Sequence, residues 1–440
     1  MFSSTLNCSF FTKHNFLKWY STSKFYPWLL ISLCSSLLFY KYILTVSPGI
    51  MAHDLMREFQ INGVELGNLA AAYFYSYTLV QIFSGIFLDR FGVRVLTGCS
   101  ILIAAMGTWL FSSAESLTIA FLGRAMIGFG LAFATVTYLK MTAVWFKPNQ
   151  VAFVTGLLAT AVMLGAVFGE APLAYLLQMT SWRFVLKFCS VLGVMISIIF
   201  IALVRDNPDP KYKKLEALDE RKTATKEKFN VQQIKKVLGN SQNWLLTFYS
   251  GLAFAPLSVL AGLWGTPFLQ LAHHLSLTQS SGMISLMFLG LGLGSPLFGL
   301  LSDRINNRVR VMKFGIILSL VSILSVIYIQ NLPVDLVGVF LFLLGFGVGA
   351  FMLGFTLGTQ INSLALAGTV VALINTGDSI FESFTEPLLG KLLDLNWGGT
   401  IVNGVRFFSL HDYHLAFIPL PLYFLASLII LFFIKEPRPC

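Results

Sequence analysis

Long apolar stretches recur along the whole chain and are separated by short breaks that are polar or contain Gly and Pro. A helix needs about 20 consecutive, mostly apolar residues to cross a bilayer, and the stretches reach that length. The pattern therefore predicts twelve membrane-spanning helices. We expect them at residues 26–48, 65–88, 94–112, 117–145, 151–177, 183–204, 243–272, 279–301, 308–330, 333–358, 365–392 and 413–434.

One longer polar segment, residues 205–242, interrupts this pattern between the sixth and the seventh predicted helix. It begins RDNPDPKYKK and carries mixed charge, so we expect a cytoplasmic linker between two groups of six helices. The predicted fold is an all-α membrane protein with two pseudo-symmetric six-helix bundles, at 26–204 and 243–434. Short cytoplasmic tails are expected at 1–25 and 435–440.

The composition is that of a membrane protein. Of 440 residues, 56% are hydrophobic and 11% are charged, whereas a soluble domain carries about 25% charged residues. The five cysteines show no paired spacing, so we expect neither a disulfide framework nor a metal cluster. The chain contains no Gly-x-x-x-x-Gly-Lys-Ser/Thr loop to hold nucleotide phosphates, so we expect no cofactor and no direct drive by ATP.

The positive charge gathers in alternate loops. The formal net charge of +10 could suggest a nucleic-acid partner, but ten Lys and Arg residues lie between Arg205 and Lys236 alone. This positive-inside distribution predicts an inner-membrane protein with both termini in the cytoplasm and with the lipid bilayer, not nucleic acid, as its partner. The Ser-rich N-terminus, free of acids before Asp54, would also suit an organelle transit peptide, and this alternative stays open.

Two short motifs occur once in each half of the chain. The first is GIFLDRFGVRVL after the second predicted helix and GLLSDRINNRVRV after the eighth, with the aspartates 214 positions apart. The second is IGFGLAF in the fourth helix and LGFGVGAF in the tenth, 217 positions apart. Nearly equal offsets indicate an internal duplication, and glycine in such motifs is expected to let helices pack closely. The first motif supplies candidate gating residues: Gly85, Asp89, Arg90, Gly92, Arg94, Asp303 and Arg304.

These Gly-x-x-x-Asp-Arg motifs, in a layout of six and six helices, resemble the major facilitator superfamily over essentially the whole chain. The stretch VSPGIMAHDLMREF and the residues after it also resemble bacterial organic-solute members, including the phagosomal nutrient transporters of intracellular bacteria. The resemblance implies a central cavity and alternating access. It also implies that Asp89 contacts the other bundle in one orientation, and that Arg124, in RAMIG, takes part in proton coupling. The antiporter signature expects Gly-Pro where this chain has Gly165-Ala166, which favours uptake over exchange.

The eleventh predicted helix contains INTGDSIFESFTEP, which is too polar for hydrocarbon. Its polar residues include Asn375, Asp378, Glu382 and Glu386. Their spacings of three, four and four positions place them on one helical face. A charge at mid-bilayer costs about 2.5–3.5 kcal/mol, and neighbouring acids in a low-dielectric site favour proton binding by at least one of them. We therefore expect Asp378 and Glu382 to couple protons and Asn375 and Glu386 to contact substrate; alternatively, Glu386 lies in the outer vestibule without a specific role.

Further polar residues inside predicted helices complete the list of candidates. Arg124 and Glu170 are candidates for proton coupling, and Lys140, near a helix end, is expected to reach the surface. The substrate-binding candidates of the first two helices are Lys41, Tyr42, Tyr73, Tyr77 and Gln81. Lys41 would meet a substrate carboxylate or pair with an acid of the eleventh helix. The tyrosines, four residues apart, form a polar face or simply pack between helices.

These features predict a proton-coupled secondary active transporter, a symporter that works as a monomer and has no enzyme activity. Its partners would be protons and a small polar organic solute. Cations on the first and fourth helices facing acids on the eleventh favour a zwitterion, such as an amino acid or a small peptide. The first alternative is a transporter or exchanger of organic anions, with Lys41 and Arg124 holding the carboxylate. The second is a membrane sensor that binds solute without moving it.

Overall fold

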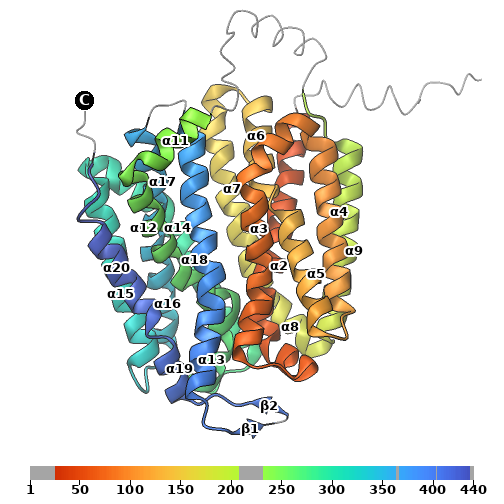
Figure 1. The fold of residues 1–440 in the computed structure, drawn as a ribbon, viewed down its shortest axis with the longest axis vertical. Helices are drawn as coiled ribbons and strands as arrows, with labels where there is room; N and C mark the ends of the chain where they lie inside the picture. Colours follow the sequence, from red (N-terminus) through yellow and green to blue (C-terminus); the bar gives the residue numbers. More distant parts are fainter. Residues whose placement is uncertain (1–24, 208–230, 363–365, 403, 437–440) are drawn as a thin grey trace, which may run out of the picture.

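The computed structural model describes residues 25–207, 231–362, 366–402 and 404–436. The expected tails and most of the expected linker at 205–242 lie outside these residues, so the limits of the two domains stay a prediction. The described chain is almost entirely helical. Figure 1 shows the helices of the first half and those of the second half as two groups side by side.

The first bundle holds the six spans expected from the apolar pattern. Its helices are α2 (Tyr26–Phe59), α3 (Gly63–Phe91), α4 (Val93–Ser112), α5 (Leu117–Leu131), α6 (Ala134–Trp145), α7 (Pro148–Gly169), α8 (Ala171–Met179) and α9 (Trp182–Leu203). The fourth and the fifth span are each divided into two helices. The first span does not end at Pro48, as expected, but continues for eleven more residues, since Pro48 lies inside α2.

The second bundle repeats this plan after the short helix α11 (Val231–Gly239). Its helices are α12 (Ser241–Val259), the π-helix η1 (Leu260–Trp264), α13 (Gly265–His273), α14 (Leu277–Ile305), α15 (Arg308–Tyr328), α16 (Val334–Val348), the 3-10 helix η2 (Gly349–Phe351), α17 (Met352–Ile361), α18 (Ala367–Asn396), α19 (Leu410–Ala416) and α20 (Pro419–Ile430). Strands β1 (Ile401–Val402) and β2 (Val405–Arg406) form a small antiparallel hairpin between α18 and α19.

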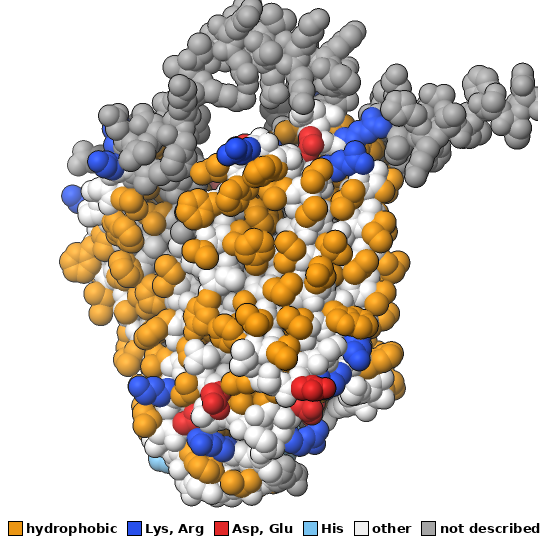
Figure 2. Space-filling view, turned by 45° about the vertical axis from the view of Figure 1, so that its right-hand side comes forward, with side chains coloured by type: hydrophobic (Ala, Val, Ile, Leu, Met, Phe, Trp, Pro, Cys, Tyr) orange, Lys and Arg blue, Asp and Glu red, His pale blue; other side chains and the backbone are white. Residues whose placement is uncertain are grey.

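The spans account for the hydrophobic surface. Among the described residues, ten helical segments are long and apolar enough to cross a membrane, and the two parts of α3, bent by 60°, make an eleventh. Helix α18 is 30 residues long and packs against α3 and α12; its acids make it too polar for the same criterion, and it is the twelfth span. Apolar side chains cover the sides of the molecule, and charged ones gather near its two ends (Figure 2).

We name the two ends by their chain segments. The hairpin end carries β1 and β2, and the linker end is where α9 stops and α12 starts (Figure 1). Helices α3, α14 and α16 begin at the hairpin end, whereas α2, α7, α12 and α18 begin at the linker end.

The second repeated motif explains how each bundle is held together. A Cβ on Gly128 of α5 would lie 2.0 Å from the carbonyl oxygen of Tyr73 in α3. In the other bundle, a Cβ on Gly345 of α16 would lie 1.8 Å from the carbonyl oxygen of Met287 in α14. Gly345 follows Gly128 by 217 positions and Met287 follows Tyr73 by 214. The same contact is therefore made twice, which confirms the pseudo-symmetric fold.

The first repeated motif does not behave as the sequence suggested. Gly85 and Gly299 were expected to allow close packing, but among the described residues a Cβ on either would meet no atom of another helix within 4 Å. That expectation is wrong for this conformation. Gly156 of α7 and Gly368 of α18 likewise have no such neighbour in the described part of the chain. These four glycines therefore do not bring helices together at the linker end.

This difference between the two motifs predicts opposite effects of one substitution. Gly345→Ala forces a methyl group onto the backbone of α14 and should lower the free energy of unfolding by about 1–3 kcal/mol. Gly299→Ala, in open space, should leave the stability unchanged or raise it by about 0.5–1 kcal/mol, because alanine favours the helix. Thermal unfolding of the purified variants in one detergent measures both. Equal melting temperatures for the two variants would contradict the packing described here.

Candidate functional site

Lys41 is a buried cation in the middle of the first bundle. Only 5% of its surface is exposed. Its Nζ donates to the hydroxyl of Tyr77 at 3.1 Å and lies 3.4 Å from Oγ1 of Thr135. The ion pairs found among the described residues do not include Lys41, so the expected direct pair with an acid of the eleventh helix is absent there. A buried ammonium held only by hydroxyl groups can accept an anion.

Tyrosines surround this ammonium group. Nζ of Lys41 lies 4.5 Å from the ring centroid of Tyr77 and 5.2 Å from that of Tyr42. The rings of Tyr73 and Tyr77 stack at 5.7 Å, and the Tyr73 hydroxyl has no hydrogen-bond partner in the described part of the chain. Oε1 of Gln81, one turn farther along α3, is equally unpartnered there. Tyrosine packing and a polar face, which the sequence presented as alternatives, therefore coexist on α3.

The polar face of α18 lies inside the molecule. Asp378, Glu382 and Glu386 are buried, and Asn375 is half-buried. Ser250 of α12 lies beside Asp378, whose Oδ1 has no hydrogen-bond partner among the described residues. The helix packs against α12 of its own bundle and against α3 of the other. The acids therefore belong to the wall between the two bundles.

The cation and the acids face one another across the bundle interface. Glu382 of α18 lies within electrostatic range of Lys41, and Tyr42 lies within range of Glu382 and Asp378. We call Lys41, Tyr42, Tyr77, Asp378 and Glu382 the central site. It offers one positive group and hydroxyl groups from one bundle, and two carboxyl groups from the other.

Arg124 takes a different place from Lys41. It is fully buried in α5, where Nη1 donates to the carbonyl of Leu44 at 2.8 Å and Nη2 to that of Ala70 at 3.1 Å. Its guanidinium group lies within electrostatic range of Glu386. Two backbone carbonyls thus occupy Arg124, which ties α2 to α3 and faces an acid of the opposite bundle.

Glu386 lies at a contact between the bundles. Only 2% of its surface is exposed, so it does not face an open vestibule in this conformation; its placement in the outer vestibule when the hairpin end opens stays a prediction. The backbone of Glu386 is 2.6 Å from where a Cβ on Gly67 of α3 would be, and its carbonyl accepts from Nε1 of Trp264 at 3.2 Å. Glu386, the nearest to the hairpin end of these three acids, therefore lies in a tight interface.

Glu170 makes no hydrogen bond to a residue of the central site. It lies at the junction of α7 and α8 and is completely buried. Neither of its carboxylate oxygens has a hydrogen-bond partner in the described part of the chain.

Both motif aspartates are paired within their own bundles. Asp89 contacts Nζ of Lys140 at 2.7 Å, and Asp303 contacts Arg308 at 3.3 Å. The contact of Asp89 with the other bundle, which the resemblance implied for one orientation, is not made in this conformation. Lys140 reaches the surface, as expected, and there it also donates to the carbonyl of Leu88.

The rest of the first motif shapes the turn between α3 and α4. Gly92 has φ +82°, and a Cβ there would lie 2.9 Å from Oδ2 of Asp206, so glycine is needed on both counts. Asp206 accepts from the backbone N–H of Arg94 at 2.9 Å. Arg90 lies over the ring of Phe91, and Arg304 is exposed near the end of α14.

The two bundles are joined at the hairpin end by a contact that the sequence did not suggest. Asp394 of α18 accepts from the backbone N–H groups of Gly63 at 3.0 Å and Val64 at 2.8 Å, the first residues of α3. Arg406 of β2 binds the same carboxylate at 2.9 Å. A carboxylate at a helix N-terminus satisfies free N–H groups and meets the positive end of the helix dipole. Asp394 therefore caps a helix of the opposite bundle.

Glycines bring the helices together around this cap. A Cβ on Gly390 of α18 would lie 2.1 Å from the carbonyl of Gly63. A Cβ on Gly49 of α2 would lie 3.1 Å from the carbonyl of Gly262 in η1. Gly262 follows Gly49 by 213 positions, so equivalent residues of the two repeats contact each other. These contacts close the hairpin end, in contrast to the open surroundings of the glycines at the linker end.

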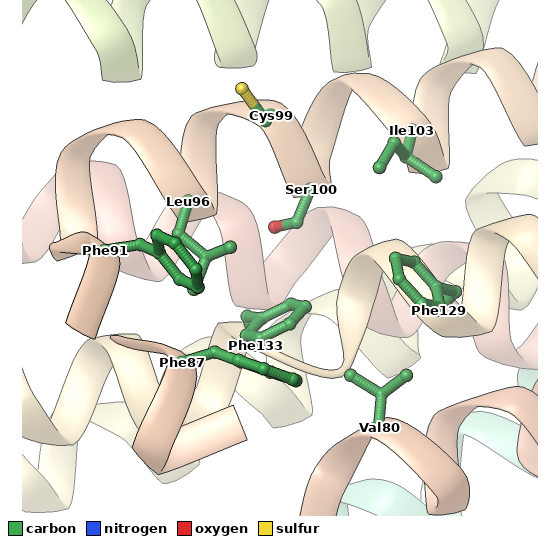
Figure 3. A pocket seen from close by; sticks show the side chains of 9 residues that line it. All are labelled: Val80, Phe87, Phe91, Leu96, Cys99, Ser100, Ile103, Phe129 and Phe133. Atoms are coloured by element: carbon green, nitrogen blue, oxygen red, sulfur yellow. The ribbon is translucent and has the colours of Figure 1, made fainter. Parts of the chain in front are cut away.

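One apolar cavity lies elsewhere, within the first bundle. It has a volume of about 240 Å³ and is lined by Val80, Phe87, Phe91, Leu96, Cys99, Ser100, Ile103, Phe129 and Phe133. Figure 3 shows aromatic rings from α3 and α5 gathered beside α4. Its surface is apolar, so it does not suit a charged solute and is separate from the central site.

The cap by Asp394 predicts a shift of conformation when its charge is removed. Asp394→Asn removes the charge that meets the N-terminus of α3 and pairs with Arg406, so it should weaken closure of the hairpin end by about 0.3–1 kcal/mol, or roughly twofold to fivefold in the ratio of closed to open molecules. Distances between spin labels on Gln178 and Leu336, which are exposed at the hairpin end of opposite bundles, would measure this ratio. The labels require a background without the five native cysteines.

Glu115→Gln serves as the control, because Glu115 is an exposed acid in the loop between α4 and α5. It should give the same distances as the unsubstituted chain. If Asp394→Asn also left the distances unchanged, the cap would have no part in closure.

Comparison with known proteins supports this architecture. The model of the Major Facilitator Superfamily matches residues 29–385. The inward-facing, unoccupied structure of a bacterial homolog of the human lysosomal transporter Spinster covers 94% of this chain and 96% of its own, with a TM-score of 0.73 and 16% identity. The inward open xylose transporter XylE from Escherichia coli covers 94% and 97%, with a TM-score of 0.70 and 12% identity.

Curated relatives are transporters as well. An uncharacterized transporter of Bacillus subtilis, YybO, is 30% identical over 39% of this chain and 40% of its own. The probable galactarate/D-glucarate transporter GudP of Escherichia coli is 24% identical over 59% and 62%. The D-galactonate transporter of another Escherichia coli strain is 29% identical over 36% and 37%. The chain thus spans less than two thirds of the length of these relatives. With a family model that matches most of its length and twelve spans in two bundles, the chain belongs to the major facilitator superfamily.

Proposed function

We propose that this protein is a proton-coupled transporter of organic anions, with sugar acids as the substrate class. The observation that carries the proposal is Lys41, a buried ammonium group that is held by hydroxyl groups and has no carboxylate partner among the described ion pairs. A substrate carboxylate would satisfy this charge. The hydroxyl groups of Tyr42 and Tyr77 beside it suit a polyhydroxylated chain.

The relatives favour this substrate class over the amino acid or peptide that the sequence suggested. Their names include galactarate, D-glucarate, D-galactonate and hexuronate, all of which join a carboxylate to several hydroxyl groups. None of these names refers to an amino acid or a peptide. The organic-anion alternative is therefore better supported, with Lys41 rather than Arg124 at the carboxylate, since two backbone carbonyls hold Arg124.

The acids of the central site supply the coupling. A substrate anion beside Lys41 adds negative charge near Asp378 and Glu382, and a nearby negative charge favours the protonated form of a carboxyl group. Binding of the anion and of a proton thus support each other. Symport requires such cooperative binding, because the loaded carrier must hold the anion and the proton at the same time.

The charges support one orientation of the protein. Arg90, Arg94, Arg304 and Arg308 lie at the linker end, and the positive-inside rule favours the cytoplasmic side of the inner membrane for that end. The structure would then represent the inward-facing conformation, closed at the hairpin end. The protein would work as a monomer in the inner membrane and would move its solute rather than only sense it, as the relatives do.

Substitution of Lys41 tests the substrate class. Lys41→Gln should raise the KM for galactonate uptake into proteoliposomes about tenfold to hundredfold, because a hydrogen bond to a charged group contributes about 1.5–3 kcal/mol. Lys41→Arg should retain part of the affinity. Lys187→Gln, a change of an exposed lysine on α9, is the matched control. An unchanged KM in Lys41→Gln, or uptake of alanine but not of sugar acids, would refute the proposal.

Substitution of the two acids tests the coupling. The double variant Asp378→Asn and Glu382→Gln should lose accumulation driven by a pH gradient, yet still exchange internal for external substrate, since Lys41 remains. Asp335→Asn, at an exposed acid of α16, should behave as the unsubstituted protein. Accumulation by the double variant that still follows the pH gradient would exclude Asp378 and Glu382 as the coupling residues.

A further inference from the structure

Glu170 occupies an interface between the bundles. It joins α7 to α8, with φ −101° and ψ −102°. On one side, a Cβ on the preceding Gly169 would lie 2.5 Å from Cγ2 of Val46 in α2. On the other side, Cβ of the following Ala171 is 3.8 Å from where a Cβ on Gly282 of α14 would be. The residue therefore lies where the first bundle meets the second, toward the hairpin end.

The carboxyl group of Glu170 has no partner in the described chain. The residue is 0% exposed, and both carboxylate oxygens lack a hydrogen bond. An ionised carboxylate in a low-dielectric interior, without a counter-charge or a hydrogen bond, costs several kcal/mol, and such a group takes up a proton instead. The closed hairpin end thus favours the protonated, neutral carboxyl group of Glu170 over the ionised one.

The charged groups of the neighbouring helices are engaged elsewhere. On α2, Lys41 donates to Tyr77 and Thr135, Arg57 pairs with Asp54, and His53 is exposed. On α9, Arg183 pairs with Glu58, and Lys187 lies over the ring of Trp109. Helices α7 and α8 contain no charged residue, and those of α14 are at its linker end, 21 or more positions after Gly282.

The internal duplication gives Glu170 a counterpart in the other bundle. Glu386 follows it by 216 positions, close to the offsets of both repeated motifs. Each glutamate lies where its helix contacts the other bundle: Glu386 against Gly67 of α3, and the residue after Glu170 against Gly282 of α14. Gly282 follows Gly67 by 215 positions. The two contacts are therefore equivalent in the two repeats.

The two glutamates differ in their charged surroundings. Glu386 has the guanidinium group of Arg124 within electrostatic range across the interface. The position 217 residues after Arg124 is Leu341, so the second bundle offers no cation to Glu170 at the equivalent position. One interface has an arginine where the other has a leucine.

We propose that Glu170 is a proton-binding residue of the hairpin-end gate, which closes when this carboxyl group is protonated and opens as it ionises. Closing takes one proton from the water on the hairpin side, and opening returns it there, so Glu170 carries no net proton across the membrane. Its role is distinct from that of Asp378 and Glu382, which the proposed function assigns to coupling. The gate rests on transport by alternating access, but not on which anion is carried.

The test measures the conformation of the protein and needs neither substrate nor transport. A negative result would therefore exclude the gate without bearing on the sugar-acid proposal. The full chain, without its five native cysteines, carries spin labels on Gln178 and Leu336 and is placed in lipid nanodiscs. Distances are recorded from pH 5 to pH 9. Because closing binds one proton, the ratio of closed to open molecules should fall with rising pH, by up to about tenfold per unit.

Glu170→Gln, which cannot ionise, should keep the short distance at every pH. Glu115→Gln should retain the pH dependence of the unsubstituted chain. Two results would overturn the proposal: an unsubstituted chain whose distances do not change with pH, or a Glu170→Gln variant with the same pH dependence. If Glu170→Gln did not fold, the pH series of the unsubstituted chain would still decide, since a flat series excludes a proton-binding gate.

Discussion

The cost of a charge inside a membrane governs the interior of this protein. Each buried ionisable group must be neutralised by a partner, a proton or a solute. Arg124 donates to two backbone carbonyls and has Glu386 within electrostatic range, Lys41 donates to hydroxyl groups and has Glu382 within electrostatic range, and Glu170 has no hydrogen-bond partner among the described residues. We assign the substrate to Lys41, whose hydrogen bonds go only to hydroxyl groups, and the protons to the buried carboxyl groups.

This requirement connects the centre of the protein with its closed end. The helix pair α3 and α18 carries parts of both, with Tyr77, Asp378 and Glu382 at the central site and Asp394 on the N-terminus of α3 at the hairpin end. Under the proposed function, a movement that separates the two helices at the hairpin end would break the cap and expose Glu386 and the central acids together. Access to the site and the charge state of its walls would then change in one step.

Much of the fold can be predicted from the sequence, because a bilayer imposes a simple rule of length and polarity. The apolar pattern gives all twelve spans, although not the division of the fourth span into α5 and α6 or the π-helix in the seventh. The two repeated motifs predict duplication. Their glycines look alike in sequence, yet Gly345 packs against a backbone and Gly299 faces open space, a difference that depends on the conformation of the whole protein.

The candidate site is predictable in its members but not in their pairing. Intramembrane charges point to Lys41, Arg124, Glu170 and the acids of α18, because such residues are rare in hydrocarbon. Which of them meet is decided by long-range packing, so the roles of Thr135 and Asp394 could not be found in the sequence. Asp394 lies in KLLDLN, where it resembles an ordinary surface acid near a helix end.

Under the proposed function, an anion at Lys41 and a proton on the acids of α18 are bound together. Titration calorimetry of galactonate binding to the purified protein, at one pH in buffers of different ionisation enthalpy, measures this linkage directly. The apparent enthalpy should vary with the buffer in the sense of proton uptake with each bound anion. The same enthalpy in every buffer, or proton release, would rule out this coupling.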